Sequence, residues 1–248
     1  MNLLVDFGNT RLKWALWGSG KRALGGVFAH ADTSLEAALG ANWRALQRPH
    51  GIFVASVVKP DKEHELIELV EEHFGREARF VRSPAAGLGF TNAYRGDPGR
   101  LGVDRFLALA AMHWDNPRAQ ILVSCGTALT LDAIAADGTH LGGLIAPSPM
   151  LMRQSLGRAT AQVGDDHGEL VEIAANTADA AWSGCQLAAV ALVERFRKTV
   201  SSRLGTEVAI VGDGGGLEEW LPLMPDVERG RDLVLRGLAL WAEQDGKP

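Results

Sequence analysis

The hydrophobic positions follow two alternating spacings along the chain. Short apolar or alternating runs typical of strands occupy residues 3–5, 11–16, 51–58, 78–81, 121–123, 128–135, 140–145 and 207–211. Apolar residues at helical spacing occupy residues 33–46, 61–74, 104–114, 149–156, 177–204 and 231–241, with Gly75 expected to end the second of these helices. The alternation of strands and helices predicts an α/β fold.

One pattern occurs twice. Residues 3–10 and 121–128 each run from an apolar strand through a Gly-containing turn into a second strand, 118 residues apart. This repeat predicts two similar lobes, residues 1–117 and 118–248, each opening with a strand, a turn and a strand. The alternative is that two α/β lobes share a generic pattern without duplication.

Residues 83–101 break the alternation. This segment contains four Gly and two Pro and shows neither spacing. We expect an irregular loop, and loops of this length are often functional.

Composition narrows the class of protein. The chain has 248 residues, 46% of them hydrophobic, and a formal net charge of −5. A net negative charge gives no support for nucleic-acid binding, because binding nucleic-acid phosphates requires clustered Lys and Arg side chains. Cys125 and Cys185 are too few for a disulfide framework, and no apolar run is long enough for a signal peptide or a membrane span. We expect a cytoplasmic protein with neither a nucleic-acid nor a membrane partner.

The first candidate for chemistry is the segment Asp6 to Lys13. A carboxylate at the end of a buried strand needs a cation or hydrogen-bond donors, and Gly8 lets backbone N–H groups approach phosphate oxygens. Asp6 could hold Mg²⁺, and Lys13 adds a positive charge. An ordinary Asp-Gly hairpin turn would produce the same residues.

The second candidate is Gly102-Val103-Asp104-Arg105, where a helix is expected to begin. Asp104 is either a general base beside the Arg105 guanidinium or an acid that stabilises the helix N-terminus. The residues alone do not distinguish between these two roles of Asp104.

Two further segments could bind a nucleotide. Residues 124–132, followed by 142–147, contain small and hydroxyl side chains in a hairpin, and residues 212–216 are rich in glycine. Either could equally be a plain turn. No G-x-x-x-x-G-K-[ST], G-x-G-x-x-G or H-E-x-x-H motif is present, which disfavours a P-loop, a dinucleotide fold and a zinc protease.

In combination, these blocks resemble the type III pantothenate kinase family, within the acetate and sugar kinase/actin superfamily. The matching residues are Asp6, Gly8, Asn9, Thr10 and Lys13; Tyr94, Gly102, Asp104 and Arg105; Gly126, Thr127, Ala128, Thr130 and Asp132; Gly142, Gly143, Ile145 and Pro147; Asn176, Thr177, Ser183 and Gly184; and Leu233, Leu235, Gly237 and Leu238.

The resemblance implies two actin-like, ribonuclease H-like lobes with a nucleotide cleft between them, and phosphorylation of pantothenate by ATP with Mg²⁺. It implies a homodimer and Asp104 as the general base. The residues expected to contact ATP are Asp6, Phe7, Gly8, Asn9, Thr10, Arg11, Leu12, Lys13 and Thr127, with Asp6 organising the metal. Those expected to hold pantothenate are Tyr94, Gly102, Val103, Asp104, Arg105 and Thr177.

One position departs from the family. An Asp that helps to bind a monovalent cation, K⁺ or NH₄⁺, usually stands where this chain has Ser124. A hydroxyl keeps an oxygen ligand but removes a negative charge, so we expect weak or altered dependence on K⁺.

Two other functions stay open at the level of sequence. One is a non-catalytic, nucleotide-responsive regulator of the same fold, and the other is a kinase for a different small hydroxylated substrate. The presence of Asp6, Asp104 and Arg105 favours an enzyme over the first. The resemblance at Tyr94, Arg105 and Thr177 favours pantothenate over the second.

Overall fold

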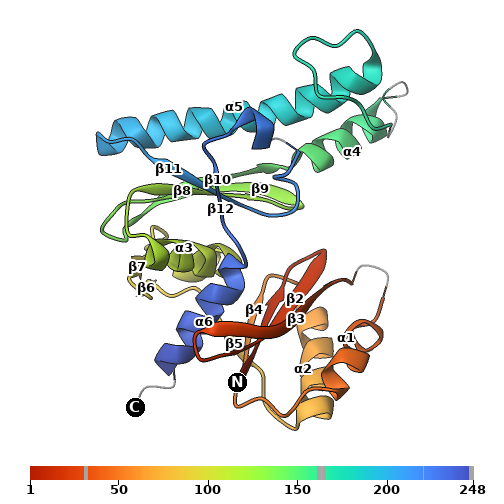
Figure 1. Ribbon diagram of the computed structural model, residues 1–248, viewed down its shortest axis with the longest axis vertical. Coiled ribbons are helices and arrows are strands. Elements are labelled where there is room, and N and C mark those ends of the chain that lie inside the picture. The colour runs from red at the N-terminus through yellow and green to blue at the C-terminus, as the bar shows by residue number, and fades with distance from the viewer. Residues whose placement is uncertain (31–32, 161–162, 164–165, 220, 246–248) are drawn as a thin grey trace. The chain divides into compact units, whose positions relative to one another are not determined.

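The computed structural model describes residues 1–30, 33–160, 163, 166–219 and 221–245. They form two compact units, each with its own sheet (Figure 1). The first unit comprises residues 1–116 together with 232–248, and the second comprises residues 117–231. None of the described helices is long and apolar enough to cross a membrane.

The first unit is built on a five-stranded sheet in the order β3-β2-β1-β4-β5. Its strands are β1 (Asn2–Phe7), β2 (Arg11–Gly18), β3 (Lys21–Ala29), β4 (Ile52–Ser56) and β5 (Arg79–Val81). Strands β1, β2 and β3 are antiparallel, whereas β4 and β5 run parallel to β1. Parallel strands place their carboxyl ends at one edge, so β1, β4 and β5 end together.

Two helices cover one face of this sheet (Figure 1). Helix α1 (Leu35–Arg44) begins where the Ser34 hydroxyl accepts a hydrogen bond from Ala37 N–H (3.3 Å). Helix α2 (Pro60–Phe74) ends at Gly75, whose φ of 55° is left-handed, as the sequence predicted. Leu3, Val5 and Phe7 of β1 point into the core under these helices, so the alternate residues Leu4 and Asp6 face the other way.

The opposite face is covered by the C-terminal helix α6 (Leu233–Asp245), which also packs against α3 (Val103–Asp115). A Cβ built on Gly237 would lie 2.3 Å from the carbonyl oxygen of Leu107, so only glycine allows this approach of α6 to α3. The rings of Phe106 and Trp241 meet edge to face, 6.2 Å apart. The last helix therefore belongs to the first unit.

The second unit repeats the topology of the first. Its sheet has the order β10-β9-β8-β11-β12, formed by β8 (Gln120–Cys125), β9 (Ala128–Ile134), β10 (His140–Pro147), β11 (Ala209–Asp213) and β12 (Glu228–Arg229). Again three antiparallel strands are followed by two parallel ones. The predicted repeat of residues 3–10 and 121–128 is confirmed by this match.

Helix α5 (Thr177–Leu204) covers the core face of the second sheet, and α4 (Pro149–Ala159) packs against α5. Helix α5 has the bounds that its spacing predicted, because the Asn176 side chain caps its start and Gly205 ends it in a left-handed conformation (φ 67°). There are also two short 3₁₀ turns, η1 (Pro98–Arg100) in the loop described next and η2 (Leu221–Leu223) in the second unit.

The predicted irregular loop at residues 83–101 contains a small hairpin, β6 (Ala86–Gly87) with β7 (Phe90–Thr91), ahead of η1. Its turn places Leu88 and Gly89 at positive φ, 55° and 75°, the conformation of a tight hairpin turn. Phe90 packs edge to face on Phe106 of α3 at 5.1 Å. The loop is therefore anchored on the helix that follows it.

The expected division into residues 1–117 and 118–248 differs from the packing at the C-terminal end. The two compact units meet at residues 116 and 117, and residues 232–245 pack with the N-terminal residues. The spacing of apolar residues in α6 predicts a buried helix without saying which core receives it. The contact between Gly237 and Leu107 decides that question.

Candidate functional site

The β1–β2 hairpin brings Asp6 and Lys13 together. The two residues are register partners on neighbouring antiparallel strands, so their side chains project from the same face of the sheet. Asp6 is half-buried, and its face is the one opposite Leu3, Val5 and Phe7. A carboxylate and an amine therefore lie side by side next to the turn, one on each of the two strands that it joins.

The turn between these strands exposes its tip. Gly8 N–H donates to Arg11 O (3.1 Å), which closes the turn, while Asn9, Thr10 and Arg11 are exposed. A Cβ on Gly8 would lie 3.2 Å from Arg11 O, a tight contact. Phe7 and Leu12, also predicted to contact ATP, have side chains that are buried in the core of the first unit.

The start of α3 belongs to the same edge of the first sheet. Ser83, two residues after β5, donates its hydroxyl to the carbonyl oxygen of Leu101 (2.7 Å). This bond ties the residue before Gly102 to the carboxyl end of β5, and β5 ends at the same edge as β1. Residues 102–105 are therefore held at the edge that carries Asp6.

Asp104 is the second residue of α3, after Gly102 at the N-cap position and Val103. Its Oδ1 accepts a hydrogen bond from Arg105 N–H (2.8 Å), and the helix dipole favours a carboxylate there. Arg105 is only 7% exposed, which is unusual for an arginine. Asp104 thus serves the helix start that one reading predicted, and it also lies at the candidate site.

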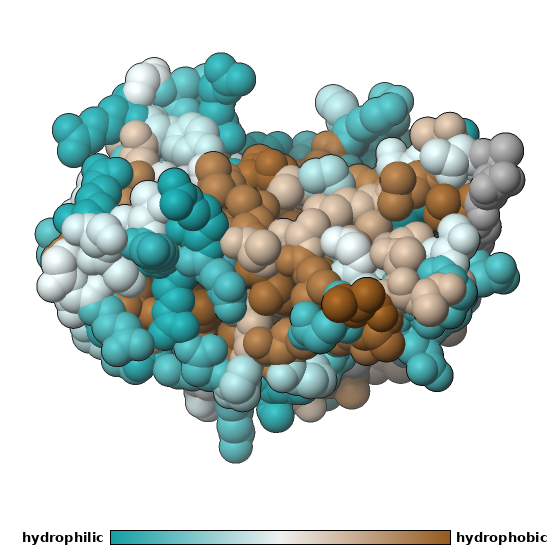
Figure 2. All heavy atoms as spheres, turned by 90° about the horizontal axis from the view of Figure 1, so that it is seen from above, coloured by the Kyte–Doolittle hydropathy of each residue, from teal (hydrophilic) through white to brown (hydrophobic). Residues whose placement is uncertain are grey.

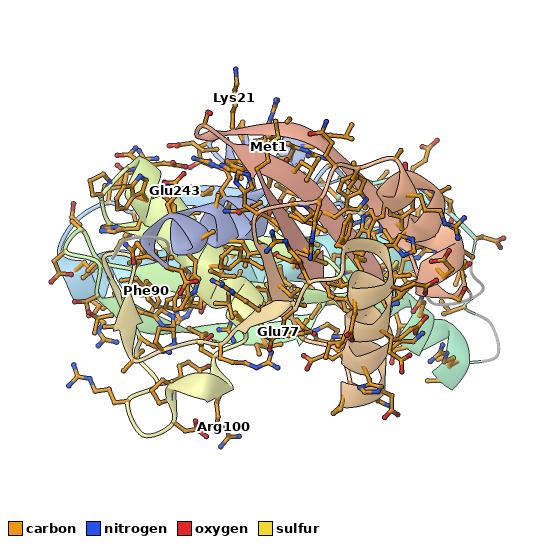
Figure 3. The ribbon with its side chains drawn as sticks, turned by 90° about the horizontal axis from the view of Figure 1, so that it is seen from below. Met1, Lys21, Glu77, Phe90, Arg100 and Glu243 are labelled. Carbon is orange, nitrogen blue, oxygen red and sulfur yellow. The ribbon has the colours of Figure 1, made fainter. Side chains whose placement is uncertain are left out.

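Asn92 organises the loop that carries Tyr94, and sequence reasoning did not single it out. The buried Asn92 amide donates to the carbonyl oxygens of Pro84 (3.2 Å) and Pro98 (3.1 Å), and its Oδ1 accepts from Tyr94 N–H (2.9 Å). One side chain therefore joins three points of the loop. Figure 3 shows this loop, with Phe90 on its hairpin and Arg100 at its outer turn.

In the second unit, three oxygen-bearing residues lie in one row across three strands. Ser124 of β8 is the register partner of Thr130 on β9 and of Asp213 on β11. All three alternate with core residues, so they share the face of the sheet away from α5. Asp213 belongs to the glycine-rich segment 212–216, but the sequence did not place it beside Ser124, because the parallel pairing that does so spans 89 residues.

The two glycine-containing segments of this unit are in contact. Gly216 N–H donates to Cys125 O (3.0 Å), and a Cβ on Gly214 would lie 2.3 Å from that same oxygen. Gly214 has a φ of 98°, which a side chain would strain. The glycine-rich loop therefore lies directly against the turn that carries the exposed Thr127.

Thr177, a predicted pantothenate contact, is the exposed first residue of α5. Glu169 N–H donates to Asp179 Oδ1 (2.8 Å), which ties the preceding loop to this first turn. Burial raises the pKa of the Cys185 thiol on the same helix, against the opposing charge of Arg153. Of the predicted site residues, Thr127 and Thr177 lie in the second unit and all others in the first.

The donor set fits a cation held largely by a nucleotide. Among the described residues no group of three or more His, Cys, Asp or Glu side chains could hold a metal ion. Mg²⁺ usually takes only one or two carboxylates and completes its shell with water and substrate phosphates. Asp6, half-buried beside an exposed turn, matches that chemistry.

A cavity of about 430 Å³ lies at the other end of β1. Leu4, Trp17 and Ala239 form part of its wall, and Figure 3 labels Met1, Lys21 and Glu243 around it. None of the predicted site residues lines this cavity.

Comparison with known proteins decides the family. The sequence model of type III pantothenate kinase matches residues 2–199. The chain belongs to this family. The type III pantothenate kinase of Xanthomonas axonopodis pv. citri is 40% identical over 245 residues, which cover 99% of this chain and 98% of the relative. The enzyme of Xanthomonas campestris pv. campestris is 38% identical with the same coverage.

Solved structures support the actin-like fold of this family member. A Campylobacter jejuni protein assigned to the Baf family of transcriptional activators matches with a TM-score of 0.62, 18% identity and coverage of 99% of this chain and 100% of that one. MreB5 of Spiroplasma citri, solved with ADP, matches with a TM-score of 0.52, 10% identity and coverage of 98% and 96%. At such identities the likeness concerns the fold alone.

Proposed function

We propose that the protein transfers a phosphoryl group from ATP to the hydroxyl of pantothenate and forms 4'-phosphopantothenate, the first step of coenzyme A biosynthesis. The observation that carries this proposal is family membership over most of the chain, with type III pantothenate kinases 40% identical to it. The candidate residues supply what phosphoryl transfer needs: anion-binding backbone, a carboxylate for metal and a second carboxylate for the hydroxyl proton.

The β1–β2 hairpin is the proposed phosphate site. Its exposed tip at Asn9 and Thr10 offers backbone and side-chain donors, while Lys13 adds positive charge on the side of Asp6. We propose that the exposed Thr127 also contacts the nucleotide. When bound, Mg²⁺ supplies charge neutralisation on the phosphates, and Asp6 is the residue that would hold it.

Asp104 is the proposed general base. In this step the substrate hydroxyl loses its proton to Asp104 as its oxygen bonds to the transferred phosphorus, and ADP leaves with the electron pair of the broken bond. The half-buried carboxylate at the start of α3 and the adjoining buried Arg105 support this role. We propose that Tyr94, the segment Gly102 to Arg105 and Thr177 hold pantothenate.

We propose that a monovalent cation binds at Ser124, but only with weak affinity. The row of Thr130, Ser124 and Asp213 consists of oxygen donors, which K⁺ or NH₄⁺ accepts. Two members are neutral hydroxyls, so the negative charge in the row comes from Asp213 alone.

We propose that the enzyme is a cytoplasmic homodimer. Its second unit exposes large apolar side chains on β10 and α4: Leu144, Ile145, Met150 and Leu156. Figure 2, viewed from the side of α5, shows hydrophobic residues gathered on the surface on that side. Exposed Ala180, Gly184 and Ala188 on α5 would let a second helix approach closely. Light scattering of the purified protein and of its Ile145→Glu variant tests whether the protein is a dimer.

The decisive experiment couples ADP release to a spectroscopic assay. Purified protein with ATP and Mg²⁺ is expected to release ADP only when pantothenate is added. Asp104→Asn keeps the shape of the side chain and should lower kcat at least about 100-fold, the usual range for a lost general base. Absence of pantothenate-dependent turnover across several monovalent salts contradicts the proposed reaction. Full activity of Asp104→Asn contradicts the proposed base.

A further inference from the structure

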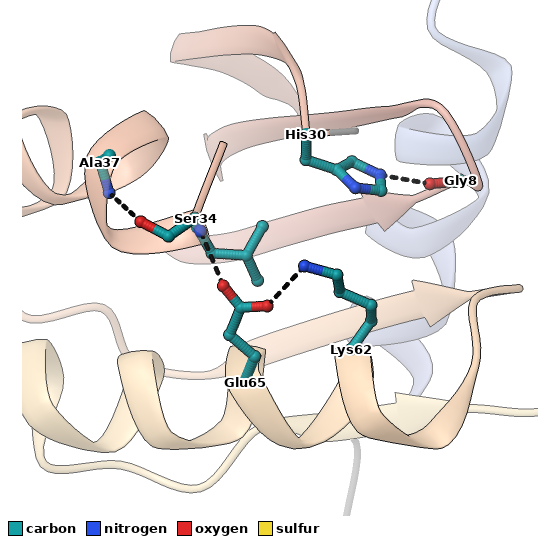
Figure 4. Close-up of polar contacts among 7 residues, drawn as sticks. Gly8, His30, Ser34, Ala37, Lys62 and Glu65 are labelled. Carbon is teal, nitrogen blue, oxygen red and sulfur yellow. Dashed lines mark hydrogen bonds and ion pairs between the residues drawn. The ribbon is translucent and has the colours of Figure 1, made fainter. Parts of the chain in front are cut away.

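His30, the residue after β3, reaches back to the turn of the β1–β2 hairpin. Its side chain is buried, with the residue only 4% exposed, and its Nε2 lies 2.8 Å from the carbonyl oxygen of Gly8 (Figure 4). A carbonyl can only accept a hydrogen bond, so Nε2 carries the proton in this contact. His30 N–H also donates to the Thr10 carbonyl oxygen (3.3 Å).

Two contacts of the imidazole and one of the His30 backbone therefore hold this residue against the hairpin. The ring meets Phe7 edge to face with centroids 4.9 Å apart, while the two hydrogen bonds reach Gly8 and Thr10. Phe7 is fully buried in the core of the first unit. The turn is thus tied through His30 to a part of the molecule that cannot move easily.

The hydrogen bond from His30 to the Gly8 carbonyl oxygen also affects the other side of the Gly8–Asn9 peptide, where the N–H of Asn9 lies. In a planar trans peptide, the carbonyl of one residue and the N–H of the next point in opposite directions. When His30 holds the Gly8 oxygen inward, the N–H of Asn9 is turned outward, and Asn9 is exposed. This is the orientation that a backbone donor needs in order to meet an anion in solvent.

We propose that His30 is a positioning residue for ATP, which holds the Gly8–Asn9 peptide in the orientation that presents the turn's backbone donor to a phosphate oxygen. This inference rests on the proposed function, in which the same turn binds the phosphates of ATP. Donors that are already oriented bind more tightly than donors that must be ordered on binding.

An apolar residue would fill the same space against Phe7 and could not orient the peptide. A buried imidazole N–H costs free energy unless it is hydrogen-bonded, and here its partner is the Gly8 carbonyl. On the neighbouring helix α2, Glu65 and Lys62 pair with each other at 2.8 Å. Electrostatic interaction with His30 also lowers the pKa of Glu65, while the hydrogen bond of the imidazole goes to the hairpin (Figure 4).

Two substitutions separate positioning from packing. His30→Gln places an amide donor near the position of Nε2, whereas His30→Leu keeps apolar bulk without a donor. His73→Leu is the matched control: His73 is a buried histidine of α2 in the same unit, packed on Trp43, and its side chain lies 3.5 Å from Glu36, away from the hairpin. Each variant is assayed for KM and kcat and titrated calorimetrically with the non-hydrolysable analogue AMP-PNP and Mg²⁺.

His30→Leu is expected to raise the KM for ATP and the Kd for AMP-PNP about tenfold, the effect of one lost hydrogen bond, with the KM for pantothenate unchanged. His30→Gln should recover most of the affinity, and His73→Leu should keep it. The proposal is overturned when His30→Leu binds AMP-PNP like the wild type, or when His30→Gln binds as weakly as His30→Leu. Failure of the proposed function would show instead as AMP-PNP binding without pantothenate turnover in the wild type.

Discussion

The carboxylate of Asp104 occupies the space in which a side chain at position 102 would begin. A Cβ built on Gly102 would lie 2.5 Å from Asp104 Oδ1, well inside van der Waals contact. The backbone at Gly102 has a φ of −50°, which any residue adopts. The glycine therefore makes room for the carboxylate and is not required by the backbone.

Gly102→Ala should consequently fold but push the Asp104 carboxylate aside. We expect kcat to fall about 10-fold or more, since displaced catalytic groups lose rate steeply, while the thermal midpoint changes little. Gly96→Ala is the control, because a Cβ on Gly96 meets nothing within 4 Å. Wild-type kcat in Gly102→Ala would show that the carboxylate position does not matter.

Asn92→Ala tests the anchor of the loop. It removes the donors to the Pro84 and Pro98 carbonyl oxygens and the acceptor for Tyr94 N–H, so the loop that carries Tyr94 loses its fixed shape. We expect a KM for pantothenate raised about tenfold, with the KM for ATP changed much less. Steady-state kinetics measure both. Thr91→Ala, at an exposed neighbour, should match the wild type. An equal rise of both KM values would argue against a specific role.

Ser124→Asp tests the cation row. The new carboxylate would stand in register with Asp213, and two adjacent carboxylates repel each other until a cation binds. K⁺ should therefore raise both the activity and the melting temperature of Ser124→Asp more than those of the wild type, with choline chloride as the ionic-strength control. Equal, strong responses of the two proteins to K⁺ would contradict the expectation.

The surroundings of Glu65 predict that the free energy of unfolding depends on pH. Burial alone would raise its pKa, but hydrogen bonds from Lys62 and from Leu35 N–H (2.8 Å), with the charge of Lys62, lower the pKa below its ordinary value. A lowered folded pKa contributes stability that is present above the ordinary Glu value of about 4.3 and is lost as pH falls through the folded pKa.

The urea midpoint of Glu65→Gln should therefore lie below that of the wild type at pH 7, and the difference should shrink as the pH falls below about 4. Glu68→Gln, at an exposed site of the same helix, serves as the control. A difference that stays constant down to pH 3 would show that the carboxylate charge contributes nothing.

Much of the fold follows from local pattern. The bounds of α5 agree with its spacing because a capping Asn and a left-handed Gly mark its two ends. Strand β3 was missed, since it pairs only with β2 at the sheet edge and its first four residues are exposed, which leaves no clear alternation. The β6–β7 hairpin was hidden because its turn places a leucine, Leu88, at positive φ, where glycine or asparagine is the usual signal.

The sequence predicted site residues only where they belong to a recognisable motif. The segments Asp6 to Lys13 and Gly102 to Arg105 were recognisable, and the bond from Ser83 to Leu101 supports their common edge. His30 and Asn92 carry no motif, because their roles are hydrogen bonds to backbone atoms, and backbone atoms leave no trace in a sequence. Asp213 comes beside Ser124 only through strand pairing.

The course of the chain has a consequence for synthesis. The second unit is one uninterrupted stretch, residues 117–231, whereas the first needs residues from both ends of the chain. As the polypeptide leaves the ribosome from its N-terminus, the sheet face that bears Leu4 and Asp6 must wait for α6, which emerges after the whole second unit. The unit translated second can therefore complete its core before the unit translated first, and the hairpin that bears Asp6 acquires its full support only when α6 has been synthesised.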